Sequence, residues 1–275
     1  WGYGNGLYLT HPDGTTTVYG HLQRYAPKIA DYVKARQYEQ ESFNVNLVLT
    51  PELIPVKRGE IVAYSGNTGG SAGPHLHFEV RDTENEEVLD PLDFFKEKIT
   101  DTQPPKIQGV LIFPIEGKGV VNGSNRKLEL KPVTAKNGKQ TLTGKIEAWG
   151  DIGLAVKAYD YMDNTTNFYG IRDITLRLDS QIIYHSNLNR FAFSESRFLN
   201  SYTDYEEWKK HRSFYMRSFV EPGNRLRFIE SFKRGIIHID EQKTYHLTYS
   251  LSDAFGNTTQ LSVWIDGKEQ PVPEP

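Results

Sequence analysis

Residues 73–81 read GPHLHFEVR and alternate between polar and apolar side chains. Successive side chains of a β-strand point to opposite faces, so this alternation predicts a strand with two distinct faces. His75 and His77 would project from one face, roughly 7 Å apart along the strand. That spacing lets two imidazoles reach one metal ion, or a metal ion and its bound water. The opposite, core-facing side would consist of Leu76, Phe78 and Val80.

A third histidine lies in an earlier strand-like segment, TTVYGHLQ at residues 16–23. The turn residues HPDG at 11–14 join this segment to LYLT at 7–10, which predicts a β-hairpin. Alternation places His21 on the polar face of its strand, with Tyr19 and Gln23. Three strand-borne histidines in one small unit indicate a metal site. A catalytic zinc site uses imidazole and carboxylate ligands and keeps one position open for water.

Composition excludes several other classes of protein. The length of 275 residues predicts two domains. The chain has no long apolar run, so we expect no transmembrane segment. A net charge of −3 gives no basic surface for nucleic acid. The absence of cysteine excludes disulfides, cysteine nucleophiles and thiolate metal sites.

Four motifs together resemble a known peptidase family. In chain order they are YGHL at 19–22, VKRGE at 56–60, SGNTGGSAG at 65–73 and GPHLHFEVR at 73–81. In this order they resemble the later half of the M23 (lysostaphin/LytM-type) zinc metallopeptidases, over residues 1–96. The resemblance implies a mainly β fold, with an antiparallel β-sheet peptidase domain of LytM type, also described as a duplicated hybrid motif.

The resemblance also implies a role for each histidine. His77 matches the family's zinc ligand, while His75 and His21 match the catalytic histidines that act on the water or the transition state. The implied cofactor is zinc and the implied substrates are peptides of bacterial cell-wall peptidoglycan. The implied location is the bacterial cell envelope, either periplasmic or at the cell surface. A rival interpretation is a non-catalytic M23-like scaffold that regulates other cell-wall hydrolases.

Two departures from the family pattern affect this interpretation. The family's other two zinc ligands form an upstream His-x-x-x-Asp pair, which would lie before Trp1. We therefore expect an N-terminally truncated chain that alone binds zinc weakly and is inactive. His11 and Asp13 have the wrong spacing to replace that pair and are interpreted as turn residues. Residues 24–56 are an insertion relative to the family, expected to border the substrate cleft and to include a short helix within 29–40 and a strand at 44–50.

The pattern changes after residue 100. We expect a peptidase domain at 1–100, a proline-containing linker at 101–107 and an immunoglobulin-like β-sandwich at 108–275, with a helical insertion near 202–212. Four alternating segments support the sandwich, at 152–158, 174–178, 247–251 and 261–265. This domain would position the peptidase and offer a surface to a cell-envelope protein partner.

Other candidate sites are weaker. Asp160, Asp163 and Asn164 in AYDYMDN suggest a calcium loop, although turn chemistry explains them better. The glycine-rich loop at 65–73 lacks the Gly-Lys-Ser/Thr ending of a phosphate-binding loop. The remaining histidines are scattered and are interpreted as structural, namely His185, His211, His238 and His246.

Overall fold

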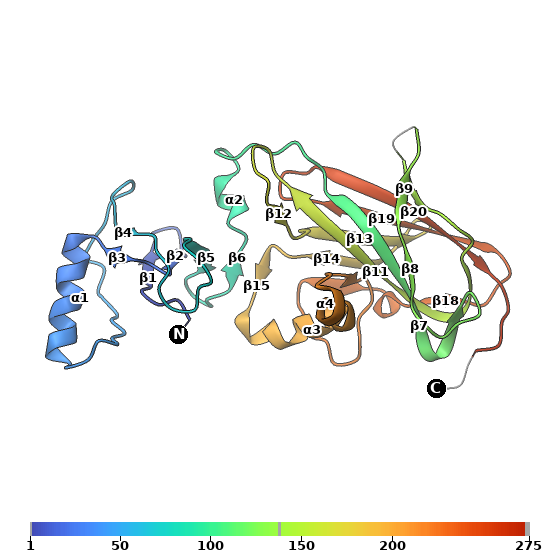
Figure 1. Ribbon diagram of the computed structural model, residues 1–275, viewed down its shortest axis with the longest axis horizontal. Coiled ribbons are helices and arrows are strands. Elements are labelled where there is room, and N and C mark those ends of the chain that lie inside the picture. The colour runs from blue at the N-terminus through green and yellow to red at the C-terminus, as the bar shows by residue number, and fades with distance from the viewer. Residues whose placement is uncertain (1, 137–138, 273–275) are drawn as a thin grey trace. The chain divides into compact units, whose positions relative to one another are not determined.

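The computed structural model describes residues 2–136 and 139–272 (Figure 1). The prediction of a mainly β fold with antiparallel sheets is confirmed. The chain divides into two compact units, residues 1–89 and residues 90–275. The domain boundaries expected from the proline-containing segment 101–107 stay a prediction.

The N-terminal unit is built on an antiparallel sheet in the order β1-β2-β5-β6. Its strands are β1 (Leu7–Thr10), β2 (Thr15–Gly20), β5 (His77–Asp82) and β6 (Val88–Leu89). Thr15 pairs with Asp82 and Gly20 pairs with His77. The end of β2 therefore meets the start of β5, which brings two histidine-bearing segments together although they are far apart in the sequence.

A small second layer in this unit contains a two-stranded ladder and one helix. The ladder pairs β3 (Arg24–Tyr25) with β4 (Ala63–Tyr64). The helix expected within residues 29–40 is confirmed as α1 (Pro27–Glu39), which starts with proline, a residue that suits the first helical turn.

The prediction of a strand at residues 44–50 is wrong, because those residues form no strand. Two apolar side chains in this region, Phe43 and Val48, are more than nine-tenths exposed. A strand is stabilised by packing its side chains against neighbours, and these side chains have none to pack against.

The C-terminal unit is dominated by one large sheet in the order β17-β14-β13-β19-β20-β11-β7-β8. The long strand β11 pairs antiparallel with β7 along most of its length. Some of the same β11 residues also pair antiparallel with β18 or β16. The strands of the C-terminal unit are β7 (Lys106–Val121), β8 (Leu128–Leu130), β9 (Pro132–Thr134), β10 (Gln140–Leu142), β11 (Glu147–Tyr161), β12 (Phe168–Tyr169), β13 (Asp173–Leu178), β14 (Gln181–Asn187), β15 (Arg190–Phe191), β16 (Met216–Arg217), β17 (Ile229–Ser231), β18 (Ile237–Ile239), β19 (Thr244–Ser252) and β20 (Thr258–Gly267).

The four alternating segments predicted in this unit are confirmed as parts of β11, β13, β19 and β20. Their inward side chains form the main core, including Leu154, Leu176, Leu247 and Val263. Burial of one face explains the alternation, because every second residue must be apolar. The immunoglobulin-like identity of this unit stays a prediction.

Short helices connect the strands of the C-terminal unit. Asp204 caps the N-terminus of α4 by accepting a hydrogen bond from the Glu207 amide at 2.9 Å. The helices are α2 (Leu92–Phe95), η1 (Phe193–Phe198), α3 (Leu199–Tyr202), α4 (Tyr205–His211) and η2 (Lys233–Gly235).

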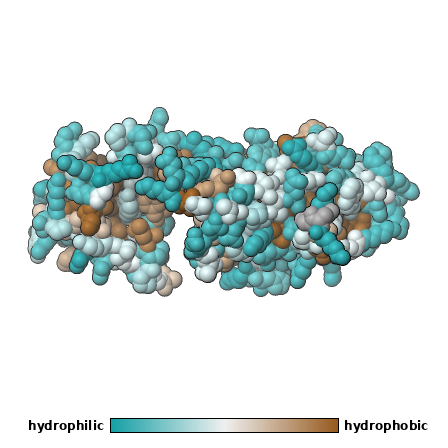
Figure 2. Space-filling model, turned by 90° about the horizontal axis from the view of Figure 1, so that it is seen from above, coloured by the Kyte–Doolittle hydropathy of each residue, from teal (hydrophilic) through white to brown (hydrophobic). Residues whose placement is uncertain are grey.

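The surface shown in Figure 2 is mostly hydrophilic, with apolar residues in small separate areas. Within the described residues, no helix has the length and apolar character needed to cross a membrane.

Candidate metal centre

The structure brings the three predicted site histidines into one cluster in the N-terminal unit. His21, His75 and His77 each offer a ring nitrogen, and these nitrogens lie within 4.8 Å of one another. The ring centroids of His21 and His75 are 4.8 Å apart, and those of His21 and His77 are 5.6 Å apart. Two ligands at about 2.1 Å from one zinc ion are at most about 4.2 Å apart, so small side-chain adjustments let these rings share an ion.

His21 does not lie on a strand as the sequence predicted. β2 ends at Gly20, and His21 follows it with a left-handed backbone, φ 57°. This conformation costs a residue with a side chain roughly 1 kcal/mol. The His21 amide donates to the Tyr3 carbonyl at 2.7 Å, which offsets part of that cost. The ring itself is buried, with the whole residue 6% exposed.

The strand expected through residues 75–81 begins later, at His77. His75 precedes it and forms an isolated bridge with Gly66 of the glycine-rich loop. The prediction that Leu76 is a core residue is therefore wrong, since it is 46% exposed, whereas Val80 on β5 is buried. Alternation applies only inside the paired strand, and Leu76 lies outside it.

Hydrogen bonds fix which ring nitrogen carries the proton in His21 and His75. His21 Nδ1 lies 2.8 Å from the Thr68 carbonyl oxygen, and His75 Nδ1 lies 2.8 Å from the Gly73 carbonyl oxygen. A carbonyl oxygen only accepts, so each Nδ1 must donate. The neutral rings then carry their lone pairs on Nε2.

His77 has the opposite arrangement. Its Nε2 lies 2.6 Å from Glu79 Oε1, and because the carboxylate accepts, Nε2 carries the proton and Nδ1 keeps the lone pair. A histidine that binds a metal usually donates its other ring N–H to a carboxylate or carbonyl. All three rings meet this condition, so the donor set suits a zinc ion.

Glu79 is the centre of a buried network behind His77. Its Oε2 accepts from Arg81 Nε at 2.7 Å, its Oε1 also accepts from the Tyr3 hydroxyl, and Arg81 Nη2 donates to that hydroxyl at 2.9 Å. Burial acts to raise the pKa of Glu79, but the hydrogen bonds from Arg81, Tyr3 and His77 outweigh it and hold the pKa below its usual value. Burial and the hydrogen bond to Glu79 raise the pKa of Tyr3 to about 12. Glu79 therefore stays an acceptor and Tyr3 stays a donor near neutral pH.

The sequence did not reveal this network. Glu79 and Arg81 were noted as part of the strand's polar face, yet each is only 7% exposed and thus buried rather than solvated. Two charged residues beside a histidine pair were the available signal for a buried ion pair. Tyr3 lies 76 positions from Glu79, and no local pattern links them.

The glycine-rich loop supports the histidines by close backbone contact. A Cβ on Gly66 would lie 2.5 Å from the Gln23 backbone nitrogen, and one on Gly69 would lie 2.3 Å from the Gly4 nitrogen. Both distances are too short for any side chain. Glycine at these positions lets the loop approach the His21 turn, where Thr68 accepts from His21.

The structure places His11 and Asp13 in the hairpin turn, as predicted. His11 Nε2 lies 2.8 Å from Thr17 Oγ1, and Asp13 accepts from the Thr15 amide and hydroxyl. Within the described residues, neither belongs to the histidine cluster.

A hollow of about 470 Å³ adjoins the Tyr3 side of the cluster. It is lined by the start of the chain and by residues of the 24–56 segment, including Tyr8, Tyr25, Gln37 and Phe43. Tyr3 also lines this hollow, and its ring centroid lies 4.9 Å from that of His77. The 24–56 segment thus borders a cavity on the Tyr3 side of the histidine cluster.

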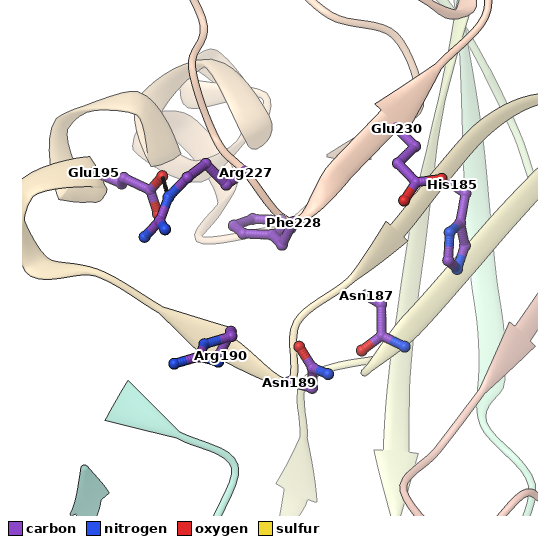
Figure 3. Close-up of a pocket in the computed structure, with 8 residues that line it drawn as sticks. All are labelled: His185, Asn187, Asn189, Arg190, Glu195, Arg227, Phe228 and Glu230. Carbon is purple, nitrogen blue, oxygen red and sulfur yellow. Dashed lines mark hydrogen bonds and ion pairs between the residues drawn. The ribbon is translucent and has the colours of Figure 1, made fainter. Parts of the chain in front are cut away.

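A smaller hollow of about 230 Å³ lies in the C-terminal unit (Figure 3). In Figure 3, Arg227 and Glu195 form an ion pair on one side, and His185 and Glu230 lie on another. His185 is also held by Asp173, at 2.8 Å. This partnership supports the structural interpretation of His185.

Comparison with known proteins finds similarity in the N-terminal part of the chain. Residues 47–91 match peptidase family M23. The chain is 34% identical over 99 residues to lysostaphin of Staphylococcus simulans, covering 35% of this chain and 15% of lysostaphin.

Two further relatives carry names that include endopeptidase. The chain is 32% identical over 80 residues to the DD-carboxypeptidase/endopeptidase Mpg of Neisseria gonorrhoeae, covering 29% of this chain and 13% of Mpg. It is 31% identical over 99 residues to the glycyl-glycine endopeptidase ALE-1 of Staphylococcus capitis, covering 35% and 21% of the two chains. The chain thus spans about a fifth or less of the length of each relative. No solved structure matches it significantly.

Proposed function

We propose that the N-terminal unit is part of a zinc-dependent endopeptidase that hydrolyses peptide bonds of bacterial cell-wall peptidoglycan in the cell envelope. One observation carries the proposal: three imidazoles with fixed tautomers meet in one cluster, and two of them, His75 and His77, lie in the region 47–91 that matches peptidase family M23. The names of two relatives, Mpg and ALE-1, state an endopeptidase activity and support the reaction class.

The proposed role of each histidine is the one that the resemblance to family M23 implies, and its hydrogen bonds are compatible with that role. His77 Nδ1 would hold the zinc ion, with Glu79 fixing the ring from behind. His75 Nε2 carries a lone pair on an exposed side chain and would accept a proton from the attacking water. His21 Nε2 would act beside it on the same water or on the developing oxyanion. When bound, zinc lowers the pKa of its water towards about 7 and polarises the scissile carbonyl.

The 24–56 segment is proposed as a wall of the substrate-binding cleft. It lines the 470 Å³ hollow beside Tyr3 and presents exposed aromatic side chains at Tyr38 and Phe43. Aromatic and amide side chains with polar surroundings suit an uncharged peptide strand. The segment would therefore select among peptides without affecting the metal.

Metal content and peptide cleavage, measured together in the natural full-length protein, test the assigned roles. His77→Ala should lose zinc, whereas His21→Ala and His75→Ala should keep most of it and lose hydrolysis by a factor of about 10² to 10⁴. His11→Ala is the matched control, a histidine of the same unit outside the cluster, and should keep both properties.

Full cleavage activity in His21→Ala or His75→Ala would contradict the catalytic role of that residue. A wild-type protein with neither zinc nor cleavage would instead favour the regulatory scaffold, with the C-terminal unit contacting a cell-envelope protein partner.

A further inference from the structure

Three aspartates from distant parts of the chain meet in the C-terminal unit. Asp101 precedes β7, Asp160 lies near the end of β11, and Asp253 starts the turn between β19 and β20. Each offers a carboxylate oxygen, and these oxygens lie within 4.8 Å of one another. The local calcium loop considered from AYDYMDN does not form, because Asp163 instead accepts from the Thr102 amide and hydroxyl.

The aspartate cluster is buried and lacks a basic partner. Asp160 is 3% exposed, and Asp101 and Asp253 are also buried. Among the described residues, no lysine, arginine or histidine forms an ion pair with any of the three. Burying carboxylates without a cation is unfavourable, because each loses hydration and repels the others.

Two oxygens in the cluster have no hydrogen-bond donor. Asp160 Oδ1 and Asp101 Oδ2 are buried and unpartnered. Buried polar oxygens normally accept a hydrogen bond, so two oxygens without a donor in one cluster require an explanation. A cation seated between the carboxylates would satisfy both oxygens at once.

The third aspartate is already held in place. Asp253 Oδ1 accepts from the Phe255 and Asn257 amides, and Oδ2 accepts from Asn257 Nδ2 at 2.7 Å. The Asn257 side chain also donates to the Asp101 carbonyl at 3.1 Å. The turn is therefore fixed to the Asp101 segment before any ion binds, which pre-organises the cluster.

Burial and the neighbouring carboxylates also affect proton binding. Burial, then the charges of Asp253 and Asp101, raise the pKa of Asp160 to about 7. Burial also raises the pKa of Asp101, aided by Asp253 and Asp163. Below neutral pH, protons compete with a metal cation for these carboxylate oxygens. The cation should therefore bind best above neutral pH.

We propose that Asp101, Asp160 and Asp253 form a calcium-binding site that ties the segment before β7 to the β19–β20 turn. The donors are all oxygens, which suit hard cations and not zinc. Two oxygens that each lie roughly 2.4 Å from one calcium ion are at most about 4.8 Å apart. The carboxylate oxygens of the cluster lie within 4.8 Å of one another, so they meet this limit. Calcium accepts irregular geometry with waters completing the shell, whereas magnesium demands a near-ideal octahedron.

Calorimetric titration of calcium into the metal-free 275-residue chain tests this site. We expect one calcium ion with a dissociation constant of about 10⁻⁴ M, in the range of extracellular modules. Calcium at 5 mM should raise the melting temperature by about 5 °C, because it binds only the folded state. The histidine cluster does not interfere, since calcium has little affinity for imidazole.

Asp160→Asn separates loss of binding from loss of folding. The amide keeps the shape and removes a repelling charge, so this variant should be at least as stable as the wild type without calcium. It should bind calcium at least 30-fold more weakly and show no rise in melting temperature. Asp101→Asn should behave in the same way. Asp163→Asn, a neighbouring carboxylate outside the cluster, should change the affinity less than threefold.

A wild-type chain without heat of calcium binding and without a melting shift would overturn the proposal. An undiminished response in both Asp160→Asn and Asp101→Asn would do the same. Equal affinity for magnesium would overturn the assignment to calcium.

Discussion

Glu79→Gln isolates the contribution of the buried network to the metal centre. In the wild type, Glu79 Oε1 accepts from His77 Nε2 at 2.6 Å and Oε2 accepts from Arg81 Nε at 2.7 Å. Glutamine keeps the size of the side chain but replaces one of these two acceptors with an NH₂ donor. If the NH₂ faces Arg81, two donors oppose each other and Arg81 Nε loses its carboxylate acceptor. If it faces His77, the ring must move its proton to Nδ1 and loses the lone pair intended for the metal.

Either arrangement weakens zinc binding. Loss of the partner behind a metal-binding histidine typically reduces affinity by a factor of about 10 to 100, equivalent to roughly 1.4 to 2.8 kcal/mol. We expect the higher part of that range, because Glu79 is 7% exposed and water cannot replace the lost acceptor. The assay is zinc competition against a chromophoric chelator in the natural full-length protein, together with ¹⁵N NMR of the His77 ring.

The NMR measurement distinguishes a local effect from unfolding. We expect the wild-type His77 ring to show a protonated Nε2, and Glu79→Gln to populate the Nδ1-protonated form. Glu84→Gln, an exposed acid after the same strand, is the matched control and should change zinc affinity less than twofold. Wild-type affinity and an unchanged His77 tautomer in a folded Glu79→Gln protein would refute the reasoning.

Three further predictions concern the loop, a capped helix and the 24–56 segment. Gly66→Ala should lower the free energy of unfolding by about 2 kcal/mol and weaken zinc binding, because the added Cβ would clash with the Gln23 backbone. Chemical denaturation measures the change in stability, and unchanged stability would show that the loop adapts. Asp204→Ala should cost about 3 kcal/mol at pH 7, because it removes the α4 cap and the buried one of the carboxylates that pair with Lys127 and Arg217. Burial acts to raise the pKa of Asp204, but the Glu207 amide, Lys127 and Arg217 outweigh it and lower the pKa. The stabilisation by Asp204 is therefore fully present above the pKa of this group in the unfolded chain, near 4, and is lost as the pH falls through its lower pKa in the folded protein. A difference in stability between the wild type and Asp204→Ala that grows in acid would contradict this prediction. Replacing residues 24–56 with a short turn should preserve zinc binding and change which peptides are cleaved, whereas loss of folding would make the segment structural.

The elements with regular periodicity were predictable from the sequence. β1, β2 and the alternating strands of the C-terminal unit follow from the rule that one buried face needs an apolar residue at every second position. The helix α1 followed from its apolar spacing. The segment 44–50 was mistaken for a strand because its composition is apolar, while the fold provides nothing for Val48 to pack against.

The clustering of the three candidate histidines was predictable, whereas the way they are held was not. Spacing and polar context pointed to His21, His75 and His77, and the structure brings all three together. The backbone at His21 and His75 departs from the expected strands, because a short left-handed turn and an isolated bridge position these rings.

Contacts over long sequence separations account for most of what the sequence could not show. Tyr3 reaches Glu79, and Asp101 meets Asp160 and Asp253, only after the sheets have formed. Neither arrangement leaves a periodic pattern, because each member is a single residue at the end of a different element. Local reasoning about AYDYMDN therefore considered Asp163 and Asn164 as partners of Asp160, while the fold supplies Asp101 and Asp253 instead.

We propose that His77 binds zinc through Nδ1 while Glu79 accepts a hydrogen bond from its Nε2–H. The most direct measurement is an anomalous difference map at the zinc edge, from crystals of the natural full-length protein grown with zinc. We expect a peak about 2.1 Å from His77 Nδ1, close to His21 and His75, with Nε2–H still donating to Glu79. A peak on His77 Nε2, or zinc bound only away from the histidine cluster, would contradict it.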